Sequence, residues 1–171
     1  MNSPVPELTD VAEILRNFQR EHIDKNSKLT VVARRRRILH SAITALGKTY
    51  FDWHKLPEVE FVGEMAADHG GPSREFFRLL MKEVQSTMGI FEGKPGRLFF
   101  VYDQADLDQG KFYTAGKLIA WSVLHGGPGI KALDPALFQL LCGQVVDLQH
   151  FEYQNLPERE VQDKLQKVLK H

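Results

Sequence analysis

The chain has little of what secreted and membrane proteins depend on. Its 171 residues contain one cysteine and no Asn-x-Ser/Thr acceptor, so neither a disulfide framework nor N-glycosylation is expected. The longest stretch without Asp, Glu, Lys or Arg is 118–130, shorter than the roughly 20 apolar residues that cross a bilayer. The first ten residues lack the basic-then-apolar order of a secretory signal. These absences predict a protein of a reducing intracellular compartment, the cytoplasm or the nucleus.

A net charge is also missing. The 22 Lys and Arg residues equal the 22 Asp and Glu residues in number, so the overall field attracts neither nucleic acid nor anionic lipid. The basic run Arg34–Arg37 does not change this, because four consecutive residues of a helix fan around the cylinder and form no stripe. We therefore expect no nucleic-acid partner and no membrane partner. Within the run, Arg35 is expected to enter a buried ion pair and the other arginines to be solvated.

Signatures of catalysis and of ligand binding are absent as well. The Asp-rich segment 103–110 lacks the Glu that a calcium loop needs at its twelfth position. No His-Glu-x-x-His, Gly-x-Ser-x-Gly or nucleotide-binding glycine motif is present. Cys142 falls on or beside the apolar face of an expected helix, which predicts a buried packing residue and not a nucleophile. We expect no catalytic residue, no cofactor and no metal site.

Hydrophobic periodicity predicts an α+β fold that is mostly helical, with a few short strands. A helix over 11–22 has Asp10 as its N-cap, and the polar residues 24–28 are interpreted as a linker that leaves this helix as a peripheral arm. A second helix is predicted over 31–46, with Gly47 as its cap. The other expected elements are strands at 59–62 and 98–102 and helices that begin near Pro72, Phe112, Pro135 and Val161.

Two of these helices carry specific expectations. The helix over 112–124 is apolar on nearly all sides, which places it in the core. Gly116 in its middle is interpreted as a point where another backbone comes close. The helix that follows Asp134-Pro135 is expected to bury one face, made of Leu137, Phe138, Leu141 and Val145.

The most distinctive segment follows the strand at 59–62 and runs from Gly63 to Phe77. Its pair Gly70-Gly71 permits a sharp reversal, and Pro72 suits the first position of a helix. Phe76-Phe77 is expected to point into the core. The free backbone amides at this helix start could bind a phosphate. Because no nucleotide motif accompanies them, we expect them to bond a carboxylate of the chain itself, such as Asp68.

This segment resembles the signature near the start of HECT ubiquitin-ligase domains. The residues that carry the resemblance are Val59-Glu60-Phe61-Val62-Gly63-Glu64, Asp68, Gly70-Gly71, Arg74-Glu75-Phe76-Phe77 and Leu79-Leu80. Three flanking features are similar to the family too: the Arg-bearing helix, the stretch 116–120 followed by His125-Gly126, and residues 138–143. Together they cover roughly 29–143 in the family's order. The likeness is closer to divergent members of the family. Ala66 departs from the family pattern, which usually has glycine there, and the turn must differ if that position needs a positive φ.

The resemblance implies part of a HECT N-lobe, its large subdomain, over residues 29–171, preceded by an N-terminal helix and linker over 1–28. It implies that the small subdomain that binds the ubiquitin-conjugating enzyme, and the C-lobe with the ubiquitin-accepting cysteine, lie outside these residues. Cys142 matches a core position, and Arg74 and Glu75 are expected to pair with Glu64 or Asp68. The scaffold residues that the resemblance implies are Gly63, Glu64, Asp68, Gly70, Gly71, Arg74, Glu75, Phe76, Phe77 and Gly116.

Two functions stay open at this point. The first is an N-lobe segment that scaffolds ubiquitin transfer to substrate lysines by a thioester relay. Its partners, met through the parent chain, would be a ubiquitin-conjugating enzyme, ubiquitin and substrate proteins, and the segment alone would be inactive. The second is a HECT-derived adaptor without transfer chemistry. The length of the full open reading frame distinguishes the two.

Overall fold

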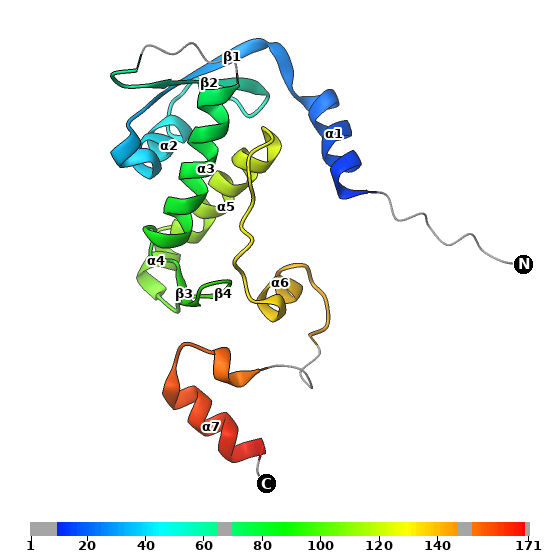
Figure 1. The fold of residues 1–171 in the computed structure, drawn as a ribbon, viewed down its shortest axis with the longest axis vertical. Helices are drawn as coiled ribbons and strands as arrows, with labels where there is room; N and C mark the ends of the chain where they lie inside the picture. Colours follow the sequence, from blue (N-terminus) through cyan, green and yellow to red (C-terminus); the bar gives the residue numbers. More distant parts are fainter. Residues whose placement is uncertain (1–9, 65–69, 147–151, 170–171) are drawn as a thin grey trace, which may run out of the picture. The chain divides into compact units, whose positions relative to one another are not determined.

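The computed structural model describes residues 10–64, 70–146 and 152–169. They form two compact units. The first contains the described residues up to Leu80 together with Ala120–Pro128, and the second contains Met81–Ile119 and the described residues from Gly129 onward. No helix in these ranges is long and apolar enough to cross a membrane. Helices outnumber strands, which confirms the α+β class with a helical majority (Figure 1).

The first unit begins with helix α1 (Val11–His22). Asp10 caps it, because the Asp10 side chain accepts a hydrogen bond from the amide of Ala12. The predicted helix and its cap are therefore confirmed. The apolar residues Val11, Ile14 and Phe18 of α1 are exposed.

The residues after α1 correct two predictions. Strand β1 (Asp24–Ala33) pairs in parallel with strand β2 (Lys55–Phe61), so 24–28 are strand and not linker, and the predicted helix over 31–46 is wrong in its first part. Burial alternates along the end of β1, where Leu29, Val31 and Ala33 are buried and the residues between them are exposed. That period of two belongs to a strand with one covered face. The sequence analysis placed Val31 and Val32 on one face of a helix, and so it did not recognise this alternation.

The connection between the two strands is a helical crossover, as a parallel pair requires. A short 3₁₀ turn, η1 (Arg35–Arg37), leads into helix α2 (Ile38–Leu46), which buries Ile38 and Ala42. Gly47 caps α2 as predicted, with a φ of −84° and hence without the left-handed conformation. The arginine run therefore lies ahead of the helix and not inside it.

Helix α3 (Gly71–Ser86) follows β2 and carries the predicted inward face. Phe76, Phe77 and Leu80 are buried in the first unit, and Val84 and Met88 are buried in the second. In the first unit the rings of Phe76 and Phe77 meet Trp121 edge to face at 5.7 and 5.3 Å. Such edge-to-face packing is a preferred aromatic geometry and adds to the stabilisation from burial. The core of this unit is thus an aromatic cluster.

The second unit contains a hairpin of strands β3 (Phe91–Lys94) and β4 (Arg97–Phe100). The strand predicted at 98–102 is confirmed as far as Phe100. β3 was not predicted, because Glu92-Gly93 interrupts any alternation. The turn Pro95-Gly96 was an available signal: proline suits the second turn position, and Gly96 has a φ of +79° at the third.

Helix α5 (Lys111–Leu124) follows a short helix, α4 (Gln104–Asp108), that Asp103 caps. The predicted core helix is confirmed, with Ala115, Leu118 and Trp121 buried. The role predicted for Gly116 is wrong, because a Cβ there would meet no atom within 4 Å. Gly116 instead lines an apolar cavity of about 400 Å³ in the second unit, bounded by aromatic rings that include Phe100 and Phe112.

Helix α6 (Pro135–Leu141) begins at the predicted cap, since Asp134 accepts from the amide of Ala136. Its expected buried face is wrong: Phe138 is 55% exposed, and Leu141 and Val145 are exposed too. Cys142 ends the helix and is also exposed, which corrects its predicted packing role. The helix ends at Leu141, so Val145 lies beyond it and cannot extend its apolar face. A 3₁₀ turn, η3 (Tyr153–Asn155), and helix α7 (Arg159–Leu169) follow.

Candidate functional site

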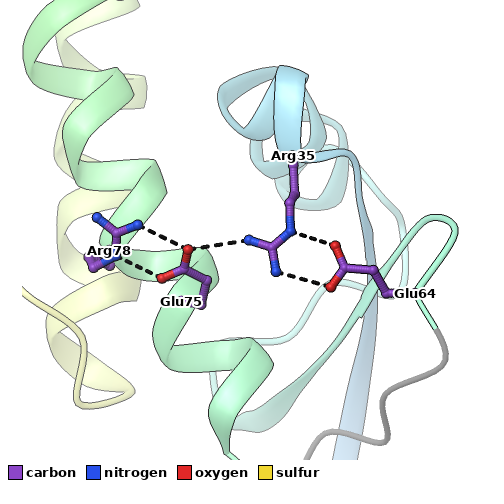
Figure 2. A network of polar contacts seen from close by, with 4 residues as sticks. All are labelled: Arg35, Glu64, Glu75 and Arg78. Atoms are coloured by element: carbon purple, nitrogen blue, oxygen red, sulfur yellow. Dashed lines mark hydrogen bonds and ion pairs between the residues drawn. The ribbon is translucent and has the colours of Figure 1, made fainter.

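Four charged side chains of the first unit meet where the distinctive segment joins the arginine run (Figure 2). Arg35 donates from Nε to Oε1 of Glu64 at 2.5 Å and from Nη2 to Oε2 of Glu64 at 3.0 Å. Its Nη1 donates to Oε1 of Glu75 at 3.2 Å. Arg78 donates from Nε to the other oxygen of Glu75 at 2.7 Å. Arg35 is therefore the bridge between two carboxylates that lie far from it in the sequence.

The four members of this network come from three local structures. Arg35 is in η1, Glu64 follows the turn after β2, and Glu75 and Arg78 lie one turn apart on α3. The guanidinium carbon of Arg35 also lies 4.1 Å from the centroid of the Phe61 ring at the end of β2, a cation–π arrangement. The planar fork of an arginine suits such bidentate and stacked contacts better than a lysine would. The network fastens the start of α3 to the end of β2.

The electrostatics follow from these contacts. Hydrogen bonding from Arg35 lowers the pKa of Glu64, and hydrogen bonding from Arg78, with a further contribution from Arg35, lowers the pKa of Glu75. The bond to Glu64 raises the pKa of Arg35, and the bond to Glu75 raises the pKa of Arg78. All four groups are therefore charged at neutral pH. The network carries no proton that could be transferred.

The predicted pairing of this segment is only partly correct. Arg35 does form ion pairs, but its side chain is 46% exposed and the pair is not buried. Glu64 pairs with Arg35, and Arg74 instead donates from Nε to the carbonyl of Gly70 at 2.9 Å. The predicted bonds to Asp68 lie outside the described residues.

The glycines of the segment adopt a backbone that other residues avoid. Gly63 has a φ of +87° and Gly70 a φ of +91°, a region where a side chain causes strain. Ser73 in the first turn of α3 donates from Oγ to the carbonyl of Pro57 at 2.8 Å, which ties the helix to β2. Ala66, the departure from the family pattern, lies outside the described residues.

His125 follows α5 in the first unit, and sequence reasoning placed it in the family resemblance without assigning it a role. Its Nε2 lies 3.1 Å from the carbonyl of Trp53, and its ring stacks on Phe77. Burial lowers the pKa of His125. The imidazole of His125 is therefore neutral. It packs against Phe77 of the aromatic cluster and forms a hydrogen bond with the backbone at Trp53. The signals available for it were its place in the family resemblance and the adjacent glycines, which mark a helix exit.

The chemical capacity of the described residues is limited. They contain no cluster of three or more His, Cys, Asp or Glu side chains that could hold a metal ion. Within 10–64, 70–146 and 152–169, Cys142 Sγ has no hydrogen-bond or ion-pair partner, so no general base accompanies it. The Arg35 network is a structural clamp that positions the start of α3.

We expect Arg35→Ala to lower the melting temperature more than Arg78→Ala does. Arg35 joins three segments of the chain, whereas Arg78 pairs with Glu75 only three residues away on the same helix. Arg35→Lys should recover part of the loss, because lysine keeps the charge without the fork. Thermal unfolding followed by circular dichroism measures all three variants.

The pH dependence provides the control for this expectation. A carboxylate whose pKa is lower in the folded state stabilises fully above its unfolded value of about 4.3, and loses this contribution as the pH falls through the folded value. The difference between wild type and Arg35→Ala should therefore persist at pH 7 and vanish under strong acid. Identical melting of the two proteins at neutral pH would contradict the clamp.

The chain was compared with known proteins. No family model matches it. It is 33% identical to the human G2/M phase-specific E3 ubiquitin-protein ligase over 107 residues, which are 61% of this chain and 15% of that protein. It is 35% identical to the human probable E3 ubiquitin-protein ligase HERC4 over 58% of this chain and 10% of that protein. It is 29% identical to the human E3 ubiquitin-protein ligase HECW2 over 88% of this chain and 10% of that protein.

The matched part of these relatives is small. The chain spans 10–15% of the length of the three human proteins. All three are E3 ubiquitin-protein ligases by name, which agrees with the sequence resemblance. These matches support a HECT-related region within this chain.

Proposed function

We propose that this chain is the large-subdomain part of a HECT N-lobe, which scaffolds ubiquitin transfer to substrate lysines without containing the acceptor cysteine. The observation that carries the proposal is that Arg35 joins Glu64, just after β2, to Glu75 on α3, because both carboxylates belong to the family signature. The partial matches to three E3 ubiquitin-protein ligases favour the same assignment.

The signature residues that the structure describes have structural roles. Glu64 and Glu75 hold Arg35, Gly63 and Gly70 adopt positive φ angles, and Phe76 is buried in the aromatic cluster. None of these positions offers a nucleophile or a proton shuttle. In the proposal they are scaffold, and the partial N-lobe includes the whole of β1, which pairs with β2.

The partners of the proposed function belong to the parent chain. They are a ubiquitin-conjugating enzyme, ubiquitin and the substrate proteins, and the transfer itself forms a thioester on a cysteine outside these residues before a substrate amine attacks it. The proposal places the protein in the cytoplasm or the nucleus, where those components act.

We expect the chain alone to form no reducible ubiquitin conjugate when it is mixed with activating enzyme, conjugating enzyme, ubiquitin and ATP. Cys142 is exposed, but a thiol needs a base or a nearby cation to become a competent nucleophile. Non-reducing and reducing gels of the same reaction provide the measurement. A thiol-sensitive band that disappears in Cys142→Ser would contradict the assignment of Cys142 as non-catalytic.

The alternative is a HECT-derived adaptor that binds proteins and takes no part in transfer. The lack of a base beside Cys142 in the described residues is equally compatible with it. The complete transcript decides between the two. A reading frame that continues through a second lobe with an exposed cysteine favours the ligase segment, and a stop codon next to His171 favours the adaptor.

A further inference from the structure

The outer edge of β1 offers unpaired peptide groups in the first unit. Within the described residues the sheet has two strands, so β1 has β2 on one side and no strand on the other. Ala33 accepts from the amide of Val62, which places the Ala33 peptide group on the β2 side. Because peptide direction alternates along a strand, the N–H and C=O groups of Thr30 and Val32 point to the outer edge. An exposed edge of this kind is a template for a further strand.

A groove runs beside this edge. The groove has a volume of about 320 Å³. One wall is β1 from Leu29 to Val32, and the other is formed by α2 and the turn that follows it. On α2 the lining includes His40 and Thr44, which are four residues apart and therefore share one face of the helix, and Lys48 lies in the turn after it. Figure 1 shows α2 beside β1. The nine residues of α2 extend about 13 Å, the length of about four residues of extended chain.

The charged side chains that line the groove are all basic. Its lining includes Arg34, His40 and Lys48 and contains no Asp or Glu. Arg34 and Lys48 are exposed and have no ion-pair partner among the described residues. The lining also includes the exposed apolar surface of Val32 and Tyr50, at 60% and 59% exposure. A ligand that fits both properties is extended, acidic and partly apolar.

We propose that the groove between β1 and α2 binds an extended acidic peptide segment of a partner protein by strand addition. The backbone of the peptide pairs with Thr30 and Val32, its acidic side chains face Arg34 and Lys48, and its apolar side chains contact Tyr50. This site is separate from ubiquitin transfer, so its test does not depend on the proposed function.

The peptide groups at the outer edge of β1 favour a peptide ligand over a nucleic acid. The outward groups of Thr30 and Val32 include carbonyl oxygens, which accept hydrogen bonds, beside amides, which donate them. A phosphate backbone supplies acceptors, so it would leave those carbonyls unsatisfied. A peptide strand supplies donors and acceptors in alternation and satisfies both.

The test is fluorescence anisotropy with the full chain and a labelled peptide of alternating Val and Glu. Three probes accompany it: the same peptide with Lys in place of Glu, the acidic peptide N-methylated at alternate amides, and a single-stranded oligonucleotide. The protein variants are Arg34→Glu with Lys48→Glu, and Lys82→Glu as the matched control on an exposed position of α3 outside the groove lining. Circular dichroism and gel filtration confirm that each variant is folded.

The proposal expects the acidic peptide to bind, and the double charge reversal to weaken this binding at least tenfold while Lys82→Glu does not. N-methylation should cause a similar loss, because it removes the donors that pair with the edge. Equal binding of the Lys peptide or of the N-methylated peptide overturns the proposal. It is equally overturned if the oligonucleotide displaces the peptide, or if the chain forms a dimer that the charge reversal dissociates.

Discussion

Phe76→Ala should lower the free energy of unfolding by about 3–5 kcal/mol, the usual loss for a fully buried phenylalanine. The side chain has no exposed surface, and its ring contacts Phe77 and Trp121 at 5.4 and 5.7 Å between centroids. The substitution removes both edge-to-face contacts and leaves a cavity in the first unit. Urea unfolding followed by tryptophan fluorescence measures the effect, since Trp121 lies in the same cluster.

The matched control is Phe138→Ala. This phenylalanine is 55% exposed on α6, so its removal should change the free energy of unfolding far less than the loss at Phe76. If Phe76→Ala does not fold, Phe76→Leu keeps most of the volume and should show a smaller loss in the same direction. Equal stability of Phe76→Ala and wild type would remove Phe76 from the core.

Gly127→Ala should destabilise the protein by about 1–3 kcal/mol, the range for overpacking a close-packed site. A Cβ at Gly127 would collide with Oγ of Ser122 and come within 2.7 Å of Cβ of Phe77. Ser122 has no freedom to retreat, because it is fully buried and its Oγ donates to the carbonyl of Pro128 at 2.7 Å. Thermal unfolding measures the loss.

Gly116→Ala is the matched glycine and should act in the opposite direction. It lies inside α5, where a Cβ would meet no atom within 4 Å, so the gain in helix propensity of about 0.5–1 kcal/mol is not offset by a clash. A destabilised Gly116→Ala variant would contradict the open cavity beside this residue. A stable Gly127→Ala variant would contradict the close packing of the α5 exit.

Both glycines show where sequence reasoning ends. Gly116 was expected to mark a close approach because it interrupts an apolar helix, and the structure contradicts this. Gly127 does lie at the exit of α5, but its sequence context did not indicate that Ser122 and Phe77 pack against it. Whether a Cβ fits depends on side chains such as Phe77, which lies 50 positions from Gly127 in the chain. No local pattern contains that information.

The Arg35 network shows the same division for the candidate site. The sequence pointed to Arg35 as the member of its run that pairs, and to Glu64 and Glu75 as charged members of the signature. The family resemblance assigned Arg74 to Glu64 or Asp68, and Asp68 lies outside the described residues. In the structure η1 brings Arg35 to Glu64 and Glu75 instead. The pairing of β1 with β2 brings the residues that follow the two strands together, and this determines that Arg35 bonds Glu64.

The sequence by itself determined the features that depend on residues within one helical turn of each other. These are the caps at Asp10 and Asp134, the start of α3 at Gly71-Pro72, and the inward face of α3 with Phe76 and Phe77. Only the tertiary structure decided whether 24–33 is a strand, whether Cys142 is covered and which carboxylates Arg35 holds. The physical reason is that strand pairing, burial and long-range ion pairs depend on a facing segment. The position of that segment follows from the packing of the whole unit.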